Sequence, residues 1–438
     1  MMTSNTPYTE AFVWIWLPEE TEPVIAGRVS AHDDLLLFNY GKSYLERLND
    51  SQNGSRSRSR SAISIYEKEL PLKPGILPLL DGLNMPGCIR DSAPDAWGRR
   101  VIINRKLGLQ GTNVDTAQLD ELTYLLESGS DRIGALDFQR SPTEYHPRLS
   151  ANVTFDELIN STERVEKGVP LTAELDQALF HGTAIGGARP KALIEKENKK
   201  YVAKFSSSND LYSIVKSEFI AMRLAEHVGL NVASVTLTRA SHKDVLLIER
   251  FDRVKVENGW QRKSMISALT LFGLDDMMAR YASYEVFAEI IRHHFSNPNK
   301  TLRELFSRLI FNILCGNTDD HARNHAAFWD GNSLTLTPAY DICPQNPSGR
   351  EASQAMLING NINLSQIKNC INAAHHFHLS KNEAMDICNH QRSVIEDKWS
   401  ATCEEANLNE IDRKLLWGRQ FLNPFVFEDL ENNNSTIE

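Results

Sequence analysis

The sequence predicts an α+β fold in which a small N-terminal β subdomain precedes a region of two lobes, a β-rich lobe and then a helical lobe. Short apolar segments separated by turn residues occur in residues 11–66 and again in 192–251, as expected for antiparallel strands. From residue 264 to residue 400 the apolar positions recur mainly at helical spacing. We therefore expect three parts, at residues 1–150, 151–260 and 261–438.

Size, composition and charge predict a soluble, cytoplasmic protein that does not associate with a membrane. The 438 residues are enough for two or three buried cores, and a net charge of -10 argues against general nucleic-acid binding by the whole chain. The six cysteines form no C-x-x-C pair, which favours reduced thiols over a disulfide framework or a zinc site. The N-terminus has no basic and apolar leader, and no apolar run approaches the roughly 18 residues that span a bilayer.

The N-terminal subdomain is expected to be a small sheet. Apolar segments predict three strands, at residues 11–17, 26–29 and 35–40, and a last strand at Ala62–Tyr66. The serine- and arginine-rich run Ser51–Ser61 separates that strand from the others and has the composition of a solvated loop. A finger that contacts nucleic-acid phosphates is the alternative reading of this run.

Helices are expected at residues 91–109 and 116–128, and helical segments between residues 153 and 175. The first of these contains the cluster Asp95–Arg100, with an acid, a tryptophan and two arginines. The cluster fits a helix with a satisfied salt bridge better than an interface.

The first segment that suggests a ligand-binding site is a glycine-rich stretch, Gly182–Lys191. Glycines let backbone N–H groups approach phosphates, and an arginine and a lysine add positive charge. It matches neither G-x-G-x-x-G nor the P-loop, so an ordinary turn remains the alternative. The hairpin predicted next, at 192–195 and 201–205, places Lys204 in an apolar strand.

An amphipathic helix is predicted at residues 214–229, followed by strands at 233–237 and 244–251. Glu218 on this helix could pair with Lys204, as a lysine–glutamate pair does in protein kinases, or could be a surface charge.

The stretch Cys315–Asn324 carries the strongest pattern. It follows an apolar helical run, and its Asn-Thr-Asp sequence breaks helices because short polar side chains compete for the backbone. Asp319 and Asn324 have the D-x-x-x-x-N spacing of the kinase catalytic loop, and Asp341 follows a second short strand, where a second metal-binding carboxylate would lie. This pattern predicts a phosphoryl-transfer site.

A metal-dependent hydrolase is the main enzymatic alternative. On a helix, the H-x-x-x-H spacing of His321 and His325 beside two aspartates would put both histidines on one face. Helix-breaking asparagines interrupt this stretch, however, and no glutamate lies between the histidines. A second histidine group, His375–His378, is better explained as part of a helix surface.

With these motifs in order, the chain resembles the HipA family, the serine/threonine-kinase toxins of bacterial type II toxin–antitoxin modules. The resemblance runs nearly end to end and is carried by Gly186–Lys191, Glu249–Arg253, Asn317–Asn324 and Pro338–Asp341. It implies a protein-kinase-like bilobal fold that uses ATP and Mg²⁺. By resemblance Asp319 is the catalytic base, and Asn324 and Asp341 are the magnesium ligands. The ATP-binding residues implied are Gly186, Gly187, Ala188, Arg189, Lys191, Lys204, Glu249, Phe251, His321, Asn324, Tyr340 and Asp341.

The resemblance also implies partners. Family members bind a small helix-turn-helix antitoxin of the HipB type, and the complex represses its own operon by binding operator DNA. Host protein substrates in the family include aminoacyl-tRNA synthetases, so stalled translation, dormancy and persistence are implied. The sequence departs from the family at the serine that is often autophosphorylated, because this position is Ala184. Either the neighbouring Thr183 takes over, or self-inactivation is absent.

The second alternative is a catalytically inactive HipA-like module that acts as an antitoxin-bound co-repressor. The presence of Lys204, Asp319, Asn324 and Asp341 argues against it, because a pseudokinase usually lacks one of these residues.

Overall fold

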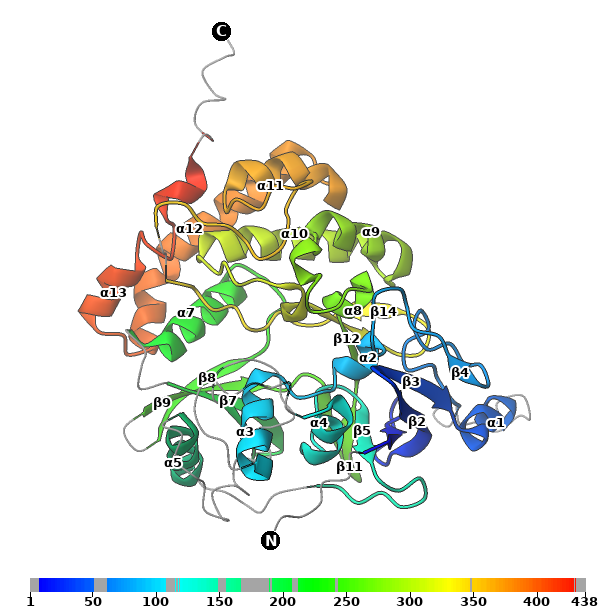
Figure 1. Ribbon diagram of the computed structural model, residues 1–438. Coiled ribbons are helices and arrows are strands. Elements are labelled where there is room, and N and C mark those ends of the chain that lie inside the picture. The colour runs from blue at the N-terminus through cyan, green and yellow to red at the C-terminus, as the bar shows by residue number, and fades with distance from the viewer. Residues whose placement is uncertain are drawn as a thin grey trace.

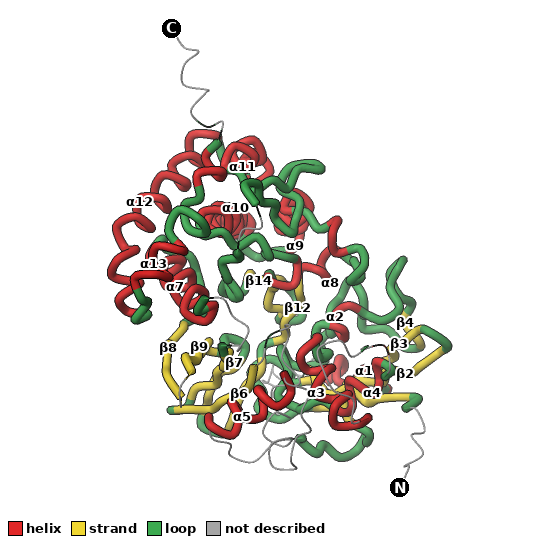
Figure 2. The backbone as a smooth tube through the Cα atoms, turned by 60° about the vertical axis from the view of Figure 1, so that its left-hand side comes forward, coloured by secondary structure: helices red, strands yellow, loops and turns green. Residues whose placement is uncertain are grey.

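The computed structural model describes residues 8–50, 61–107, 119–148, 155–166, 191–206, 212–240, 243–346 and 349–428, with the single positions 115, 117, 189 and 430. Helices α9 to α13 form one lobe, and the strands of the two larger sheets lie on the opposite side of the molecule (Figures 1 and 2). In the part of the chain that the structure describes, no helix is both long and apolar enough to cross a membrane.

The N-terminal subdomain is built on an antiparallel sheet of five strands in the order β4-β3-β2-β1-β5. The three predicted strands are confirmed, and side chains that face the core, such as Val13 and Phe38, are fully buried. The elements of this part are β1 (Glu10–Ile15), β2 (Val24–His32), β3 (Leu35–Tyr40), α1 (Lys42–Asp50), β4 (Ile76–Leu77), α2 (Gly87–Arg90), α3 (Ala96–Leu107), α4 (Glu121–Glu127) and β5 (Leu136–Gln139).

The strand predicted at Ala62–Tyr66 is wrong, because this segment joins no sheet. Two buried tyrosine hydroxyls satisfy its backbone instead. The N–H of Ile65 donates to the Tyr40 hydroxyl at 2.9 Å, and the Tyr44 hydroxyl donates to the carbonyl of Ile63 at 2.8 Å. The preceding serine- and arginine-rich run, 51–60, lies outside the described residues.

The two helices predicted in this part are shorter than expected. Helix α3 begins only at Ala96, because Pro94 disfavours a helical conformation for the residue before it. Helix α4 begins at Glu121, where the Asp120 side chain caps the N–H of Thr123 at 2.7 Å. The salt-bridge reading of the Asp95–Arg100 cluster is confirmed, because Arg99 pairs with Glu121 at 2.6 Å.

A four-stranded antiparallel sheet, β6-β7-β9-β8, follows. Successive side chains along β7 point to opposite faces of this sheet. Ala203 and Phe205 pack with Leu158 of α5 on one face, so Lys204 faces the opposite side, where α7 lies. The elements are α5 (Phe155–Glu166), β6 (Lys191–Lys196), β7 (Lys199–Phe205), α7 (Ile214–His227), β8 (Val235–Ala240) and β9 (Lys243–Glu249).

The rest of the chain is mainly helical, as predicted, around the buried helix α10. One difference is that Ser264–Ser267 is a strand, β12, which pairs with β13 and so completes a three-stranded sheet. The elements are β10 (Arg253–Val256), β11 (Gly259–Arg262), β12 (Ser264–Ser267), α8 (Ala268–Phe272), η5 (Ala279–Tyr281), α9 (Tyr284–His294), α10 (Pro298–Leu314), η6 (Ala322–Asn324), β13 (Ala326–Trp329), β14 (Leu334–Leu336), α11 (Ile367–Ala373), η7 (Ala374–Phe377), α12 (Lys381–Glu405), α13 (Glu410–Leu416) and η8 (Pro424–Phe427).

A buried cluster of charges, here called the clamp, joins the N-terminal subdomain to the segment after β9. It consists of Asp131, Lys200, Arg250, Asp252 and Arg253. Asp131 accepts from Lys200 at 2.6 Å and from both arginines at 2.9 Å, and Asp252 accepts from each arginine at 2.8 Å. All but Lys200 are less than a tenth exposed. The clamp therefore holds together two segments that are 119 residues apart.

The clamp predicts a specific dependence of stability on pH. Burial works against the charged form of both aspartates, but the arginines outweigh it and hold the pKa of Asp131 and that of Asp252 below the usual value. Carboxyls with a lowered folded-state pKa contribute stability above their unfolded pKa, about 3.9, and lose it as the pH falls further. We expect the free energy of unfolding, measured in urea, to decrease as the pH is lowered from 5 to 3. In Asp131→Asn this decrease should be shallower; equal slopes would contradict the prediction.

Candidate phosphoryl-transfer site

The loop after α10 is held in shape by its own backbone and side chains. Gly316 has φ +71°, and a Cβ there would lie 2.6 Å from the carbonyl oxygen of Gln420, so only glycine fits. The Asn317 amide donates to the side-chain oxygen of Asn312 at 3.0 Å. The Asn324 amide donates to the backbone carbonyl of Asp319 at 3.1 Å, which ties the two ends of the D-x-x-x-x-N pattern together. Asp319 itself is exposed.

A buried group beneath this loop was not expected from the sequence. Asp320, which is 1% exposed, pairs with His325 at 2.9 Å and accepts from the Tyr284 hydroxyl at the start of α9. Burial opposes its charge, but His325 and these hydrogen bonds lower the pKa of Asp320. The side chain of Asp320 thus anchors the loop from below, and its neighbour Asp319 is left on the outer side.

Tyr284→Phe tests this anchor. The variant removes a donor from a buried carboxylate, so the free energy of unfolding should fall by about 1–3 kcal/mol. Tyr281→Phe is the matched control, since Tyr281 is 53% exposed and only three residues away. Urea unfolding would measure both variants, and equal stability of the two would contradict the anchoring role.

Lys204, Glu218 and Asp341 form a triad between the lobes. The Lys204 ammonium lies 2.6 Å from Glu218 of α7 and also donates to Asp341. Burial disfavours its charge, yet the two carboxylates raise the pKa of Lys204. In the same way Lys204 and Lys191 overcome burial and lower the pKa of Asp341. The pairing of Lys204 with Glu218, which the sequence left open, is therefore confirmed.

A cavity of about 390 Å³ lies beside this triad. Its apolar wall includes Val202, Ile248 and Met265, and Phe251 stacks obliquely on Tyr340 with 5.6 Å between ring centroids. Its polar wall includes His321 and Asn324. A cavity with one flat apolar side and one charged side has the size and character of a small-molecule site.

The polar wall fits a magnesium nucleotide. Carboxylate and amide oxygens, as on Asp341 and Asn324, are ligands that Mg²⁺ prefers. Lysine ammoniums suit phosphate oxygens, and burial together with Lys204 lowers the pKa of Lys191 to about 8. His321 adds a buried ring nitrogen, Nδ1, that has no hydrogen-bond partner within the described residues. An atom of this kind beside a cavity indicates a site for a polar ligand.

The structure brings most of the predicted site residues together. The cavity is lined by Lys191, Lys204, Glu249, Phe251, His321, Asn324, Tyr340 and Asp341. Asp319 is not among the residues that line the cavity, although it comes two residues before His321, which is. Arg189 is described but does not line the cavity. Gly186, Gly187 and Ala188, with Thr183 and Ala184, lie outside the described residues, so the glycine-loop prediction stays a prediction.

One wall of the cavity was missed by sequence reasoning. It comes from the N-terminal subdomain, where Asp91 accepts from the N–H and the hydroxyl of Ser267 at 2.7 and 2.6 Å. Asp95 pairs at 3.0 Å with Arg323, the residue before Asn324. No sequence signal could have shown this contact, because 228 residues separate the two side chains.

The geometry disfavours the hydrolase alternative. His321 lines the cavity, whereas His325 is 3% exposed and is engaged by Asp320 on the other side of the loop. The residues between them form a single 3-10 turn, so the two rings do not share a helical face. Among the described residues, no group of three or more histidine, cysteine or acidic side chains could hold a metal ion.

Fold and site together define a bilobal protein of the protein-kinase-like class, with an added N-terminal β subdomain. Residues 183–399 match the family model of the HipA-like C-terminal domain. The chain is similar over 94% of its length to HipA of Shewanella oneidensis in a solved complex of HipA, HipB and operator DNA, with a TM-score of 0.67 and 18% identity. The chain therefore contains a HipA-like C-terminal domain, and its fold is similar to that of HipA.

Two curated relatives match part of the chain. A Haemophilus influenzae protein named "Putative kinase" is 29% identical over 38% of this chain and 54% of its own length. The "Serine/threonine-protein kinase toxin HipA" of Shewanella oneidensis is 25% identical over 36% of this chain and 42% of its own length. The chain thus spans about half the length of the curated relatives it matches.

Proposed function

We propose that this protein is a serine/threonine-protein kinase toxin that transfers the γ-phosphate of ATP to a hydroxyl of a host protein. The observation that carries the proposal is the meeting of Lys204, Glu218 and Asp341 beside a nucleotide-sized cavity, with Asn324 in its wall. Phosphoryl transfer needs little covalent participation by the protein. Positioning of the reactants and neutralisation of charge therefore supply most of the rate acceleration.

Each residue has a distinct proposed role. Asn324 and Asp341 would hold Mg²⁺, which neutralises charge on the phosphates when bound. Lys204 would bind phosphate oxygens, with Glu218 keeping its ammonium in place. Asp319 would accept the proton of the substrate hydroxyl, and its exposed position suits a group that must reach a second protein.

The adenine would lie at the apolar end of the cavity. Phe251 and Tyr340 offer a flat aromatic surface, and Glu249 ends strand β9 there. The Glu249 side chain is occupied by Lys199 at 2.7 Å, so any contact with the base would come from the backbone. The glycine stretch Gly186–Ala188 would cover the phosphates.

The partners follow from the family. A HipB-type helix-turn-helix antitoxin would neutralise the toxin, and the pair would bind operator DNA, as the solved Shewanella complex contains HipA, HipB and operator DNA. We propose a cytoplasmic protein whose substrate is a host protein, of which an aminoacyl-tRNA synthetase is one candidate, with dormancy as the outcome.

Phosphate transfer from labelled ATP and Mg²⁺ tests the proposal, with the purified chain alone and with a cell extract. Label on a discrete extract protein would establish the kinase and provide its substrate. Label on the chain itself, lost in Thr183→Val, would show that Thr183 replaces the serine that is absent at Ala184. ATP binding without any transfer would instead favour the inactive co-repressor.

A further inference from the structure

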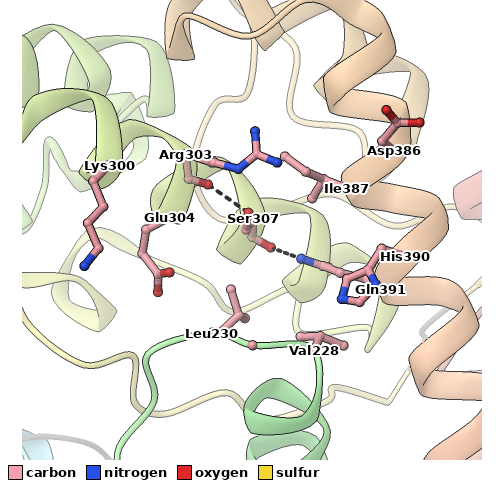
Figure 3. A pocket seen from close by; sticks show the side chains of 11 residues that line it. Val228, Leu230, Lys300, Arg303, Glu304, Ser307, Asp386, Ile387, His390 and Gln391 are labelled. Atoms are coloured by element: carbon pink, nitrogen blue, oxygen red, sulfur yellow. Dashed lines mark hydrogen bonds between the residues drawn. The ribbon is translucent and has the colours of Figure 1, made fainter.

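A second pocket lies where the end of α7 meets α10 and α12 (Figure 3). Its volume is about 510 Å³, and its lining comes from the end of α7, from α10 and from α12. Val228 and Leu230, each 7% exposed, form an apolar floor, and Ile387 of α12 lies across the pocket from them. We refer to it as the α7–α10–α12 pocket. None of the roles proposed above uses it.

The charges around this pocket favour an anion. Lys300, Arg303 and His390 line it, and within the described residues none of them forms an ion pair. Of the two acids in the lining, Glu304 is already occupied by Arg308 at 2.9 Å. Asp386 is the other, and it lies exposed on α12. Within the described residues, Lys300 and Arg303 thus face one carboxylate in the lining, Asp386, that forms no ion pair.

The pocket also presents a buried acceptor. Gln391 is 2% exposed, and its amide nitrogen donates to the carbonyl of Ser307 at 2.9 Å, as Figure 3 shows. Its amide oxygen has no hydrogen-bond partner within the described residues. A buried acceptor of this kind can be satisfied by a donor that a ligand supplies.

Hydrogen bonds connect this pocket to the phosphoryl-transfer site. Glu304 accepts from the N–H of Asn231 at 3.1 Å and from Arg308, and Arg308 donates to the carbonyls of Asn231 and Thr337 at 3.1 and 2.8 Å. The N–H of Ala339 donates to the same Asn231 carbonyl at 2.8 Å, two residues before Asp341. The pocket floor also directly follows α7, the helix that carries Glu218.

We propose that the α7–α10–α12 pocket binds a small organic phosphate with hydroxyl or amine donors, and that binding there changes the affinity of the nucleotide site. The phosphate would be held by Lys300, Arg303 and His390, and a ligand donor would satisfy the Gln391 oxygen. The coupling would pass through Glu304, Arg308 and Asn231 to the Asp341 segment. This second part rests on the proposed function, whereas the binding of the phosphate does not.

The test uses the full-length chain and glycerol 3-phosphate as the probe, with neutral glycerol as the matched control ligand. Calorimetric titration should show saturable binding of the phosphate and none of glycerol. The double variant Lys300→Gln/Arg303→Gln should weaken this binding about tenfold or more, because both lost groups make charge-assisted hydrogen bonds. Lys398→Gln, which removes one charge elsewhere on α12, should leave it unchanged.

The same samples test the coupling. Saturating glycerol 3-phosphate should change the dissociation constant of Mg-ATP about fivefold or more in the unaltered protein, and not in the double variant. No saturable binding, or equal binding by the double variant, would overturn the site. An unchanged ATP affinity would overturn the coupling. Failure of ATP to bind at all would count against the proposed function but not against phosphate binding.

Discussion

Asp319→Asn is expected to lower the rate of phosphate transfer by about 10²–10⁴-fold, with little change in ATP affinity. Asparagine has nearly the same shape but cannot accept the proton of the attacking hydroxyl. ATP binding should persist because Asp319 does not line the nucleotide cavity. Although the Asp319 residue is exposed, partial desolvation of its carboxyl group and the nearby Asp341 raise the pKa of Asp319, and His321 opposes this.

Transfer is measured with labelled ATP and the substrate found in the extract, and ATP affinity by calorimetry on the same preparations. Asp397→Asn is the matched control, since it makes the same chemical change on the exposed surface of α12, where the Asp397 side chain is 68% exposed. Equal transfer rates for Asp319→Asn and Asp397→Asn would exclude Asp319 as the base.

Asp131→Asn is expected to lower the free energy of unfolding by about 3–5 kcal/mol at neutral pH. The change leaves the buried Arg250 and Arg253, with the partly buried Lys200, around a neutral amide, and Asp252 is then the only carboxylate of the clamp. Removing one partner of a buried charge cluster lowers the free energy of unfolding by more than the whole pairing contributes to it. The reason is that the remaining charges stay desolvated. Urea unfolding of the full chain measures the loss.

Glu195→Gln is the control for this second prediction. Glu195 also approaches Lys200, at 3.9 Å, but its side chain is 53% exposed. An exposed pair of this kind contributes about 0–1 kcal/mol, so the control should be nearly as stable as the unaltered protein. A loss in Asp131→Asn no larger than in Glu195→Gln would show that the clamp contributes little.

The sequence predicted the local parts of the site well. The period of apolar residues placed Lys204 in a strand and Glu218 on a helix, and helix-breaking residues placed Asp319 and Asn324 in a loop. These features depend on neighbours within a few residues, which is why a single sequence contains them. The same reasoning failed at Ala62–Tyr66, where tyrosine hydroxyls from β3 and α1 replace a strand partner.

By itself the sequence thus determined the order of most elements and many of the residues that line the candidate site. Only the tertiary structure decided which distant groups meet there. Asp95 reaches Arg323, Asp131 reaches Arg250 and Arg253, and the end of α7 forms one wall of a second pocket. These long-range contacts depend on how whole elements pack. The sequence around a charged residue is the same whether that residue is buried against a partner or surrounded by water, so the sequence alone does not show the contact.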